Sequence, residues 1–526
     1  MFKNHPAGLI PAALSNMGER FGYYIMNAVL VLFLCSKFGL SGETSTLIYS
    51  FFYAGIYILS LVGGIIADKT QNYKGTIING LIVMTAGYVI LSIPILHSAG
   101  NHTWLLVLTC AALFLIAFGN GLFKGNLQAI VGQLYDNPRY SAQRDSGFQI
   151  FYVFINIGGL VAPFVAPLLR SWWLEVHNMV YNADFPEMCH KFLSVTDTMN
   201  AENMENLYAV ATAAGHVAGT DLQAFCSQYL EVFNTGIHYS FIASVAAMVI
   251  SLLIFVFTKS MLPSPAARAK AQTETYTDAE LKAQAKEIKQ RMVALFAVLG
   301  IVIFFWFSFH QNGTSLSLFA RDFVETDKIA PEIWQAVNPF FVIVLTPLIM
   351  LLFGSLSRRG REISTPRKIA IGMGLAGLAY LFLAVYCAMK GYPSGDTFRE
   401  MTAAAKEGMK AGPWVLIALY FFLTVAELFI SPLGLSFVSK VAPRHLQGLC
   451  QGLWLGATAV GNLMLWIGPL MYNKWPVSYA WGVFLAVCLV SMGVMFGMVK
   501  WLERVTSDKP VEKHPEPLKT TEKDVI

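Results

Sequence analysis

Long apolar segments separated by shorter polar ones run through all but the last part of this 526-residue chain. A helix needs about 20 apolar residues to cross a bilayer, and twelve segments approach or exceed that length. They lie near residues 9–35, 45–67, 76–98, 103–133, 147–170, 237–258, 292–320, 332–355, 366–390, 412–440, 447–473 and 477–502. The pattern therefore predicts an all-α polytopic membrane protein with twelve transmembrane helices.

Two polar interruptions are longer than the others. Residues 259–291 contain two prolines and a charged linker helix at 277–291, with six apolar segments on either side, which indicates a cytoplasmic linker between two six-helix halves. Residues 171–236 hold eight acidic residues against the single basic Lys191, and we expect a small folded extracytoplasmic cap there, with helices near 201–214 and 221–233. The predicted domains are residues 1–258 with the cap inserted, 259–291, 292–502 and a charged cytoplasmic tail at 503–526.

Basic residues are concentrated in the loops that follow even-numbered segments, from Lys69 and Lys74 to Lys440 and Arg444. Cytoplasmic loops carry an excess of lysine and arginine, so both termini are predicted to be cytoplasmic. The net charge of +5 then reflects topology and gives no indication of nucleic-acid binding. Composition agrees, since 13% of residues are charged against about 25% in soluble domains. The first segment is too long for a cleavable signal peptide.

Two charges interrupt the first apolar segment. Glu19 and Arg20 lie inside it, where each costs roughly 2.5 kcal/mol or more. They share one broad helical face with Asn16, Tyr23 and Tyr24, which indicates a polar cavity and not a lipid-facing surface. Neighbouring residues on a helix point about 100° apart, so we expect Glu19 and Arg20 to contact different partners.

Charges also occur within later segments. Lys124 lies in the fourth, and Glu427 is the only acid in the interior of the apolar segments of the second half, with Asn338 on a neighbouring segment. Arg20 and Lys124 form a positive pole suited to a carboxylate, and Glu427 with Asn338 forms a negative pole suited to an ammonium group. A short zwitterionic peptide matches such a cavity. The alternative is an intramembrane ion network that serves only the structure.

Several motifs occur in one order along the chain. They are Asn16-x-x-Glu19-Arg20-Phe21-x-Tyr23-Tyr24, Gly63-Gly64-Ile65-Ile66-Ala67-Asp68-Lys69, Gly121-Leu122-Phe123-Lys124-Gly125-Asn126, Phe151-Tyr152-x-x-Ile155-Asn156-x-Gly158, Glu427-Leu428-Phe429-Ile430-Ser431-Pro432 and Gly452-Leu453-Trp454. In these motifs the chain resembles the proton-dependent oligopeptide transporter (POT/PTR) family of the major facilitator superfamily, over nearly its whole length except residues 171–236. The resemblance implies the major facilitator fold, with two six-helix bundles.

The resemblance also implies a function and a site. It implies import of di- and tripeptides by proton symport and alternating access, driven by a proton gradient, with no cofactor and no metal. The implied carboxylate ligands are Arg20, Lys124 and Tyr24, the implied amine ligands are Asn156, Asn338 and Glu427, and Tyr57 and Trp454 match positions that line the pocket. Packing is the alternative role for both aromatic residues, and helix–helix contact is the alternative for Asn156.

The chain departs from the family at two acidic positions. The first acid of the first motif is Asn16, and His310 stands before Gln311, where the family often has Asp or Glu. Histidine titrates near 6.5 in water, so we expect proton coupling to run through His310 together with Glu19 and Glu427. The alternative is a neutral His310 that only forms hydrogen bonds in the cavity.

Other expectations concern the cap, the partners and competing functions. Cys189 and Cys226 are the only cysteines of the cap, on the side of the membrane where disulfides persist, and we predict that they form one. The predicted partners are small peptides and the lipid bilayer of a plasma or inner membrane, with a monomer as the functional unit. Alternatives are transport of an amino-acid conjugate or an anion, uncoupled facilitation, and a substrate sensor. No nucleophile–base pair or metal cluster indicates an enzyme.

Overall fold

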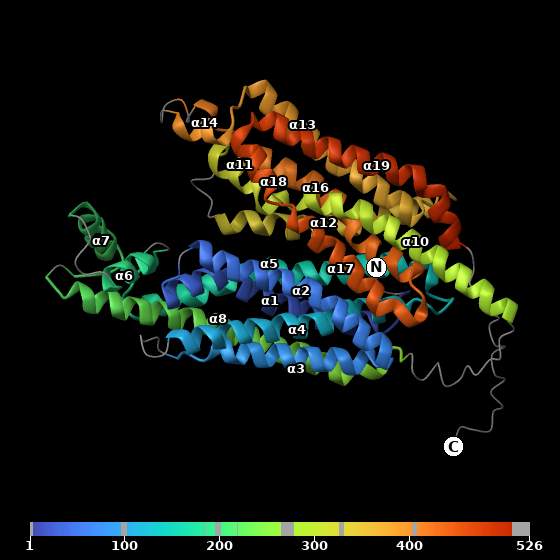
Figure 1. The fold of residues 1–526 in the computed structure, drawn as a ribbon, viewed down its shortest axis with the longest axis horizontal. Helices are drawn as coiled ribbons and strands as arrows, with labels where there is room; N and C mark the ends of the chain where they lie inside the picture. Colours follow the sequence, from blue (N-terminus) through green and yellow to red (C-terminus); the bar gives the residue numbers. More distant parts are fainter. Residues whose placement is uncertain are drawn as a thin grey trace, which may run out of the picture.

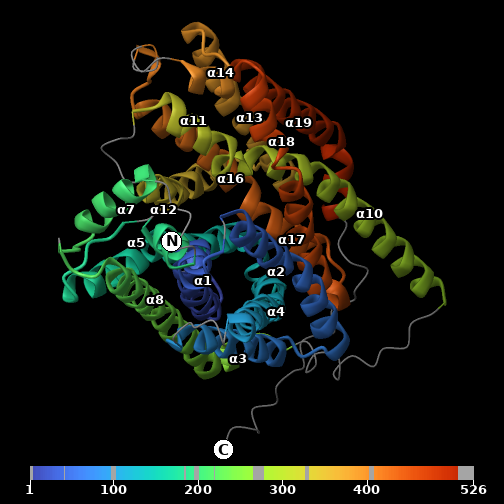
Figure 2. The same cartoon turned by 60° about the vertical axis from the view of Figure 1, so that its left-hand side comes forward.

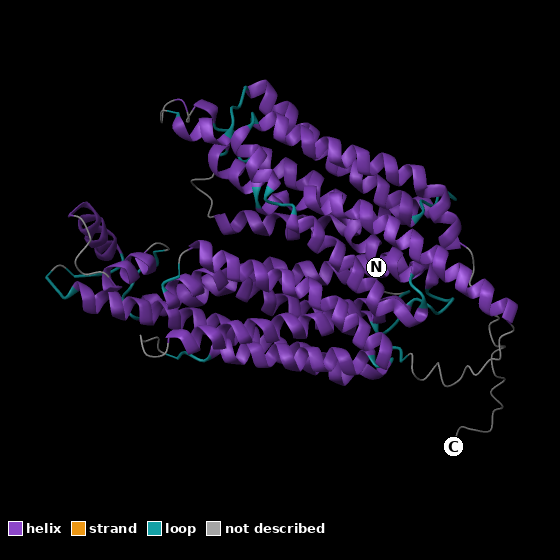
Figure 3. Cartoon of the chain, in the orientation of Figure 1, coloured by secondary structure: helices purple, strands orange, loops and turns teal. Residues whose placement is uncertain are grey.

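The computed structural model describes residues 4–40, 42–95, 102–182, 185–194, 201–217, 219–264, 278–325, 331–401, 405 and 408–507. Within these ranges twelve helical stretches are long and apolar enough to cross a membrane, as predicted. Helices make up almost all of the described chain, and its only extended pairing is an isolated bridge between Val324 and Ala411 (Figure 3). The predicted all-α polytopic fold is confirmed.

The spanning helices form two groups of six. The first comprises α1 (Leu9–Phe38), α2 (Gly42–Thr70), α3 (Tyr73–Ser92), α4 (His102–Leu134), α5 (Arg144–Val176) and α8 (Leu222–Thr258). The second comprises α10 (Asp278–Phe309), α12 (Pro331–Arg358), α13 (Thr365–Lys390), α16 (Trp414–Val441), α17 (Gln447–Leu463) and α19 (Val477–Ser507). Figure 1 shows the first group in blue to green and the second in yellow to red, and Figure 2 shows the same division after a rotation of 60°.

The two halves converge at one end of the molecule and separate toward the other (Figure 1). We call the first the linker end, because α8 ends and α10 begins there, and the second the cap end. The closest packing between the halves pairs α2 with α17 and α5 with α12. Glycine permits the first of these contacts, since a Cβ atom at Gly64 of α2 would lie 2.5 Å from the carbonyl oxygen of Gly448 on α17.

The cap contains α6 (Phe185–Ser194), α7 (Ala201–Ala213) and the first turns of α8. The helix predicted near 201–214 is confirmed. The helix predicted at 221–233 is also present, but it is not separate from the span, because α8 continues without a break from Leu222 into the membrane, with its first turn capped by the Asp221 side chain. Residues 195–200 lie outside the described part of the cap.

On the second half, short helices cover the cap end. The 3₁₀-helix η3 (His310–Gly313) and α11 (Ser315–Phe323) follow α10, α14 (Gly395–Glu400) follows α13, and α18 (Ile467–Lys474) follows α17. They pack through an aromatic cluster in which the ring centroids of Phe323 and Phe398 lie 4.3 Å apart. This cluster fixes α11 against α14.

The linker differs from its prediction. Residues 265–277 lie outside the described part, but residues 278–291 are the first turns of α10 itself and not a separate linker helix. No proline interrupts the chain between Asp278 and Phe309, so one helix runs from the charged stretch into the membrane. Likewise α19 extends to Ser507, and the rest of the predicted tail lies outside the described residues.

Candidate functional site

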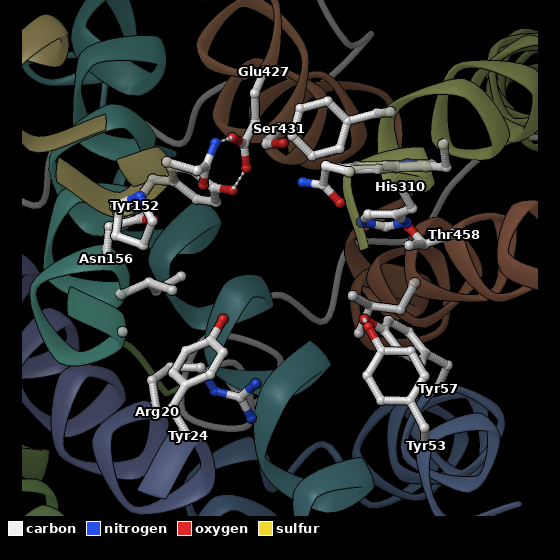
Figure 4. A pocket seen from close by; sticks show the side chains of 18 of the residues that line it. Arg20, Tyr24, Tyr53, Tyr57, Tyr152, Asn156, His310, Glu427, Ser431 and Thr458 are labelled. Atoms are coloured by element: carbon white, nitrogen blue, oxygen red, sulfur yellow. Dashed lines mark hydrogen bonds between the residues drawn. The ribbon is translucent and has the colours of Figure 1, made fainter. Parts of the chain in front are cut away.

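A cavity of about 700 Å³ lies between the two halves, within the range typical of ligand sites. Nine of the site residues predicted from the sequence line it: Arg20, Tyr24, Tyr57, Lys124, Asn156, His310, Asn338, Glu427 and Trp454. Figure 4 shows Arg20 and Tyr24 on the opposite side of the cavity from Glu427. Glu19 does not line the cavity. It is fully buried beside Arg20.

Glu19 and Arg20 pair with each other. The Arg20 Nε and Nη2 atoms donate to the two carboxylate oxygens of Glu19, both at 2.6 Å, and Asn120 Nδ2 donates to Glu19 Oε1 at 2.6 Å. The expectation that these neighbours contact different partners is therefore wrong. Both side chains are long enough to turn toward each other along the helix, and a buried charge without a partner is far more costly than that turn.

Lys124 has a different environment from Arg20. Its Nζ atom lies 4.9 Å from the centre of the Tyr57 ring, which is a cation–π distance. Within the described chain it has neither an ion pair nor a hydrogen bond. Asn16 also lines the cavity and supplies no carboxylate. Lys124 is therefore a cation in the cavity wall that is available to an anionic group of a ligand.

Glu427 forms the opposite pole. Asn338 Nδ2 donates to its Oε2 atom at 2.7 Å, and the Tyr152 hydroxyl donates to its Oε1 atom (Figure 4). Tyr152 lies on α5 and Glu427 on α16, so this hydrogen bond joins the two halves across the cavity. Tyr152 is not among the site residues predicted from the sequence. The sequence feature that could have indicated a site role for Tyr152 is its position one helical turn before Asn156 in the same motif.

His310 lies on the cavity wall at the start of η3. Its ring stacks on Trp306 with centroids 4.9 Å apart, and its Nδ1 atom lies 2.5 Å from Asn462 Oδ1. An amide oxygen only accepts, so Nδ1 carries the proton of the neutral ring and Nε2 keeps its lone pair. Asn462 is 152 residues away in the sequence, and no motif indicated this contact.

At the linker end, ionic contacts hold the halves together. Asp145 of α5 accepts from Lys440 at 2.6 Å and from Lys368 at 2.9 Å, and both lysines belong to the second half. Asp68 of α2 accepts from the backbone N–H groups of Gly448 and Leu449 at the start of α17, at 2.9 and 2.7 Å. Two carboxylates of the first half thus join the two halves at this end.

The cap positions a buried pair of thiols. Cys189 of α6 and Cys226 of α8 are fully buried and unbonded. A hydrogen bond to Cys226, together with burial, raises the pKa of the Cys189 thiol. The disulfide between them stays a prediction.

A comparison with known sequences identifies the family. The sequence profile of the POT family matches residues 74–279 and 266–481. The chain belongs to the POT family. It is an integral membrane transporter of the major facilitator type and not an enzyme.

Curated relatives of this POT chain cover most of its length. It is 27% identical over 461 residues to dipeptide and tripeptide permease B of Edwardsiella piscicida, which covers 85% of this chain and 82% of the permease. It is 28% identical over 486 residues to the peptide transporter YePEPT of Yersinia enterocolitica, which covers 88% and 87% of the two chains.

Solved structures share its fold. A peptide transporter POT in complex with sulfate superposes with a TM-score of 0.57 at 21% identity, over 96% of both chains. A POT family transporter in complex with 5-aminolevulinic acid gives a TM-score of 0.58 at 17% identity, over 96% of this chain and 98% of the other. These matches confirm the predicted major facilitator fold.

Proposed function

We propose that this protein imports di- and tripeptides together with protons by alternating access, with a proton gradient as its energy source. The observation that carries the proposal is the separation of unlike charges across one cavity, with Lys124 on the first half and Glu427 on the second. A zwitterionic peptide supplies a carboxylate for one and an ammonium group for the other. The relatives named as peptide permeases support the same substrate class.

In this proposal each pole has supporting groups. Lys124 binds the peptide carboxylate, with Arg20 and Tyr24 beside it. The ammonium group binds at Glu427 with Asn338 and Asn156. Tyr57 and Trp454 form walls that bind side chains through apolar contact.

The contacts between the halves support alternating access. Residues from the cap-end part of the second half, among them Tyr420 and Arg321, line the cavity, whereas Asp145 and Asp68 join the halves at the linker end. The positive-inside rule makes the linker end cytoplasmic. We therefore propose an outward-facing arrangement in a plasma or inner membrane with both termini cytoplasmic. Inward opening requires the contacts of Asp145 and Asp68 to break.

Proton coupling is proposed to involve His310, Glu19 and Glu427. His310 and Glu427 line the cavity, whereas Glu19 acts through its pair with Arg20. Each of these side chains can bind a proton. Each also forms a hydrogen bond with an asparagine side chain in or beside the site. One chain encloses the whole cavity, so a monomer suffices as the transporting unit.

Blocked peptides test the role of the two termini. We expect Ala-Ala to raise the melting temperature of the purified protein in detergent. N-acetyl-Ala-Ala lacks the ammonium group and Ala-Ala amide lacks the carboxylate, so each should give a clearly smaller shift. Equal shifts for all three compounds would contradict the dipolar site, and a shift with nitrate alone would support an anion transporter instead.

A facilitator without proton coupling is the second candidate. Asn16 favours it, because this cavity residue cannot titrate where the family has an acid. Its signature is peptide equilibration across the membrane without accumulation.

A further inference from the structure

The cavity extends beyond Glu427 toward the cap end. Leu416, Tyr420 and Glu427 line it along one face of α16, and the eleven residue steps from Leu416 to Glu427 correspond to about 16 Å of helix. A peptide held between Lys124 and Glu427 leaves this outer part unfilled. The residues that line this outer part therefore have no role in the proposed binding of the two peptide termini.

Arg321 of α11 lines this outer part and is held in one orientation. Its Nε atom donates to Asp322 Oδ1 at 2.8 Å and its Nη2 atom donates to Asp322 Oδ2 at 3.2 Å. Asp322 is itself buried and accepts a hydrogen bond of 2.9 Å from the Tyr472 hydroxyl. The guanidinium is thus fixed by a side chain that is anchored in the aromatic cluster of the cap end.

The fixed guanidinium keeps donors for a ligand. Arginine has five N–H donors, and Asp322 takes two of them, so the remaining three are available toward the cavity. The Arg321 side chain is 58% exposed, in contrast to the buried Arg20. The planar edge of a guanidinium can donate two parallel hydrogen bonds to the two oxygens of a carboxylate.

We propose that Arg321 is a specificity-determining residue that favours peptides with an acidic side chain on their first residue. The inference rests on the proposed function, in which the peptide ammonium binds at Glu427. The side chain of the first residue branches from the carbon that carries this ammonium, so it lies beside Glu427, on the half that also carries Arg321. The side chain of the second residue lies nearer Lys124.

Two peptides of equal composition and charge separate this effect from general attraction of anions. For the wild-type protein in proteoliposomes, we expect kcat/KM for Glu-Ala to exceed that for Ala-Glu by about threefold to fivefold, the size of effect that a partly exposed ion pair gives. In Arg321→Gln the ratio should fall to about one. The ratio is measured within one preparation, so differences in expression or folding cancel.

Two further variants complete the test. Lys474→Gln removes an exposed charge at the same end that pairs with Asp396 outside the cavity, and it should keep the wild-type ratio. Arg321→Lys keeps the charge without the planar edge and should give an intermediate ratio. A wild-type ratio of one, or an unchanged ratio in Arg321→Gln, would overturn the inference while leaving peptide transport intact. Failure of the wild-type protein to transport Ala-Ala would instead overturn the proposed function, and this inference with it.

Discussion

At the residue scale, the proposed function assigns the binding of the two peptide termini to Lys124 and Glu427, which both line the cavity. We predict that Lys124→Ala and Glu427→Ala each lower kcat/KM for Ala-Ala by roughly tenfold to a hundredfold, because each removes a hydrogen bond to a charged group worth about 1.5–3 kcal/mol. Initial rates of uptake into proteoliposomes measure this. Lys474→Ala, which removes a charge outside the cavity, is the matched control. Wild-type rates in both cavity variants would count decisively against the site.

His310 stands where the family often has an acid, and the proposed function gives it a part in proton coupling. We predict that His310→Gln abolishes accumulation driven by a pH gradient, since glutamine can still form a hydrogen bond with Asn462 but cannot titrate. Peptide counterflow needs no gradient and should continue in the variant. If gradient-driven accumulation survives the substitution, the coupling site lies elsewhere.

That these charges and amides line one cavity could be predicted, because such groups inside apolar segments are costly unless they face a cavity. The same reasoning failed for Glu19, since the spacing of two residues on a helix does not show how far long side chains can turn. It also missed Tyr152 and Asn462. Their roles depend on partners from distant segments, which the order of residues does not reveal.

At the element scale, α6 docks the cap onto the end of α1 through His190. Its Nε2 atom lies 2.7 Å from the backbone oxygen of Ser36, so the neutral ring donates this bond. Burial is the main cause that lowers the pKa of His190 below 6.5, and His102 adds to it. The unfolded state therefore binds more protons than the docked state, and stability falls as the pH drops below about 6.5.

This gives a pH prediction for the cap. Hydrogen exchange in α6, corrected for its intrinsic pH dependence, should become faster in the wild-type protein as the pH falls from 7 to 5. In His190→Gln, whose amide can donate to Ser36 without titrating, exchange corrected for its intrinsic pH dependence should change less. Identical pH profiles in the two proteins would exclude His190 as the cause.

The contact between α6 and α8 supports the predicted disulfide. Closing a loop between Cys189 and Cys226 would stabilise the cap by about 3–4 kcal/mol, and both thiols are buried where α6 packs against α8. Mass spectrometry of the non-reduced protein from membranes should show the linked peptides. Recovery of both cysteines in alkylated form would contradict the prediction.

The twelve spanning helices could be predicted because each is a long run of apolar residues. The helices of the cap were harder to predict. Helix α6 has ten residues, begins at Phe185-Pro186 and carries two charges, so it gives no long apolar pattern. The first turns of α8 are polar enough to look like a separate element, although no proline separates them from the span.

At the scale of the whole molecule, the sequence indicated two halves but not how they meet. The closing contacts of Asp145 and Asp68 join helices whose positions differ by more than two hundred residues. Only the packed structure places these groups together. It also places the unlike charges of Lys124 and Glu427 across one cavity, which is the basis of the account.

Uptake of labelled Ala-Ala into proteoliposomes, with and without an imposed inward proton gradient, tests this account most directly. We predict that the gradient drives accumulation above the external concentration and that without it the peptide only equilibrates. Equilibration under both conditions would contradict proton symport and leave a facilitator. Absence of any uptake by protein that is folded and correctly inserted would contradict peptide transport itself.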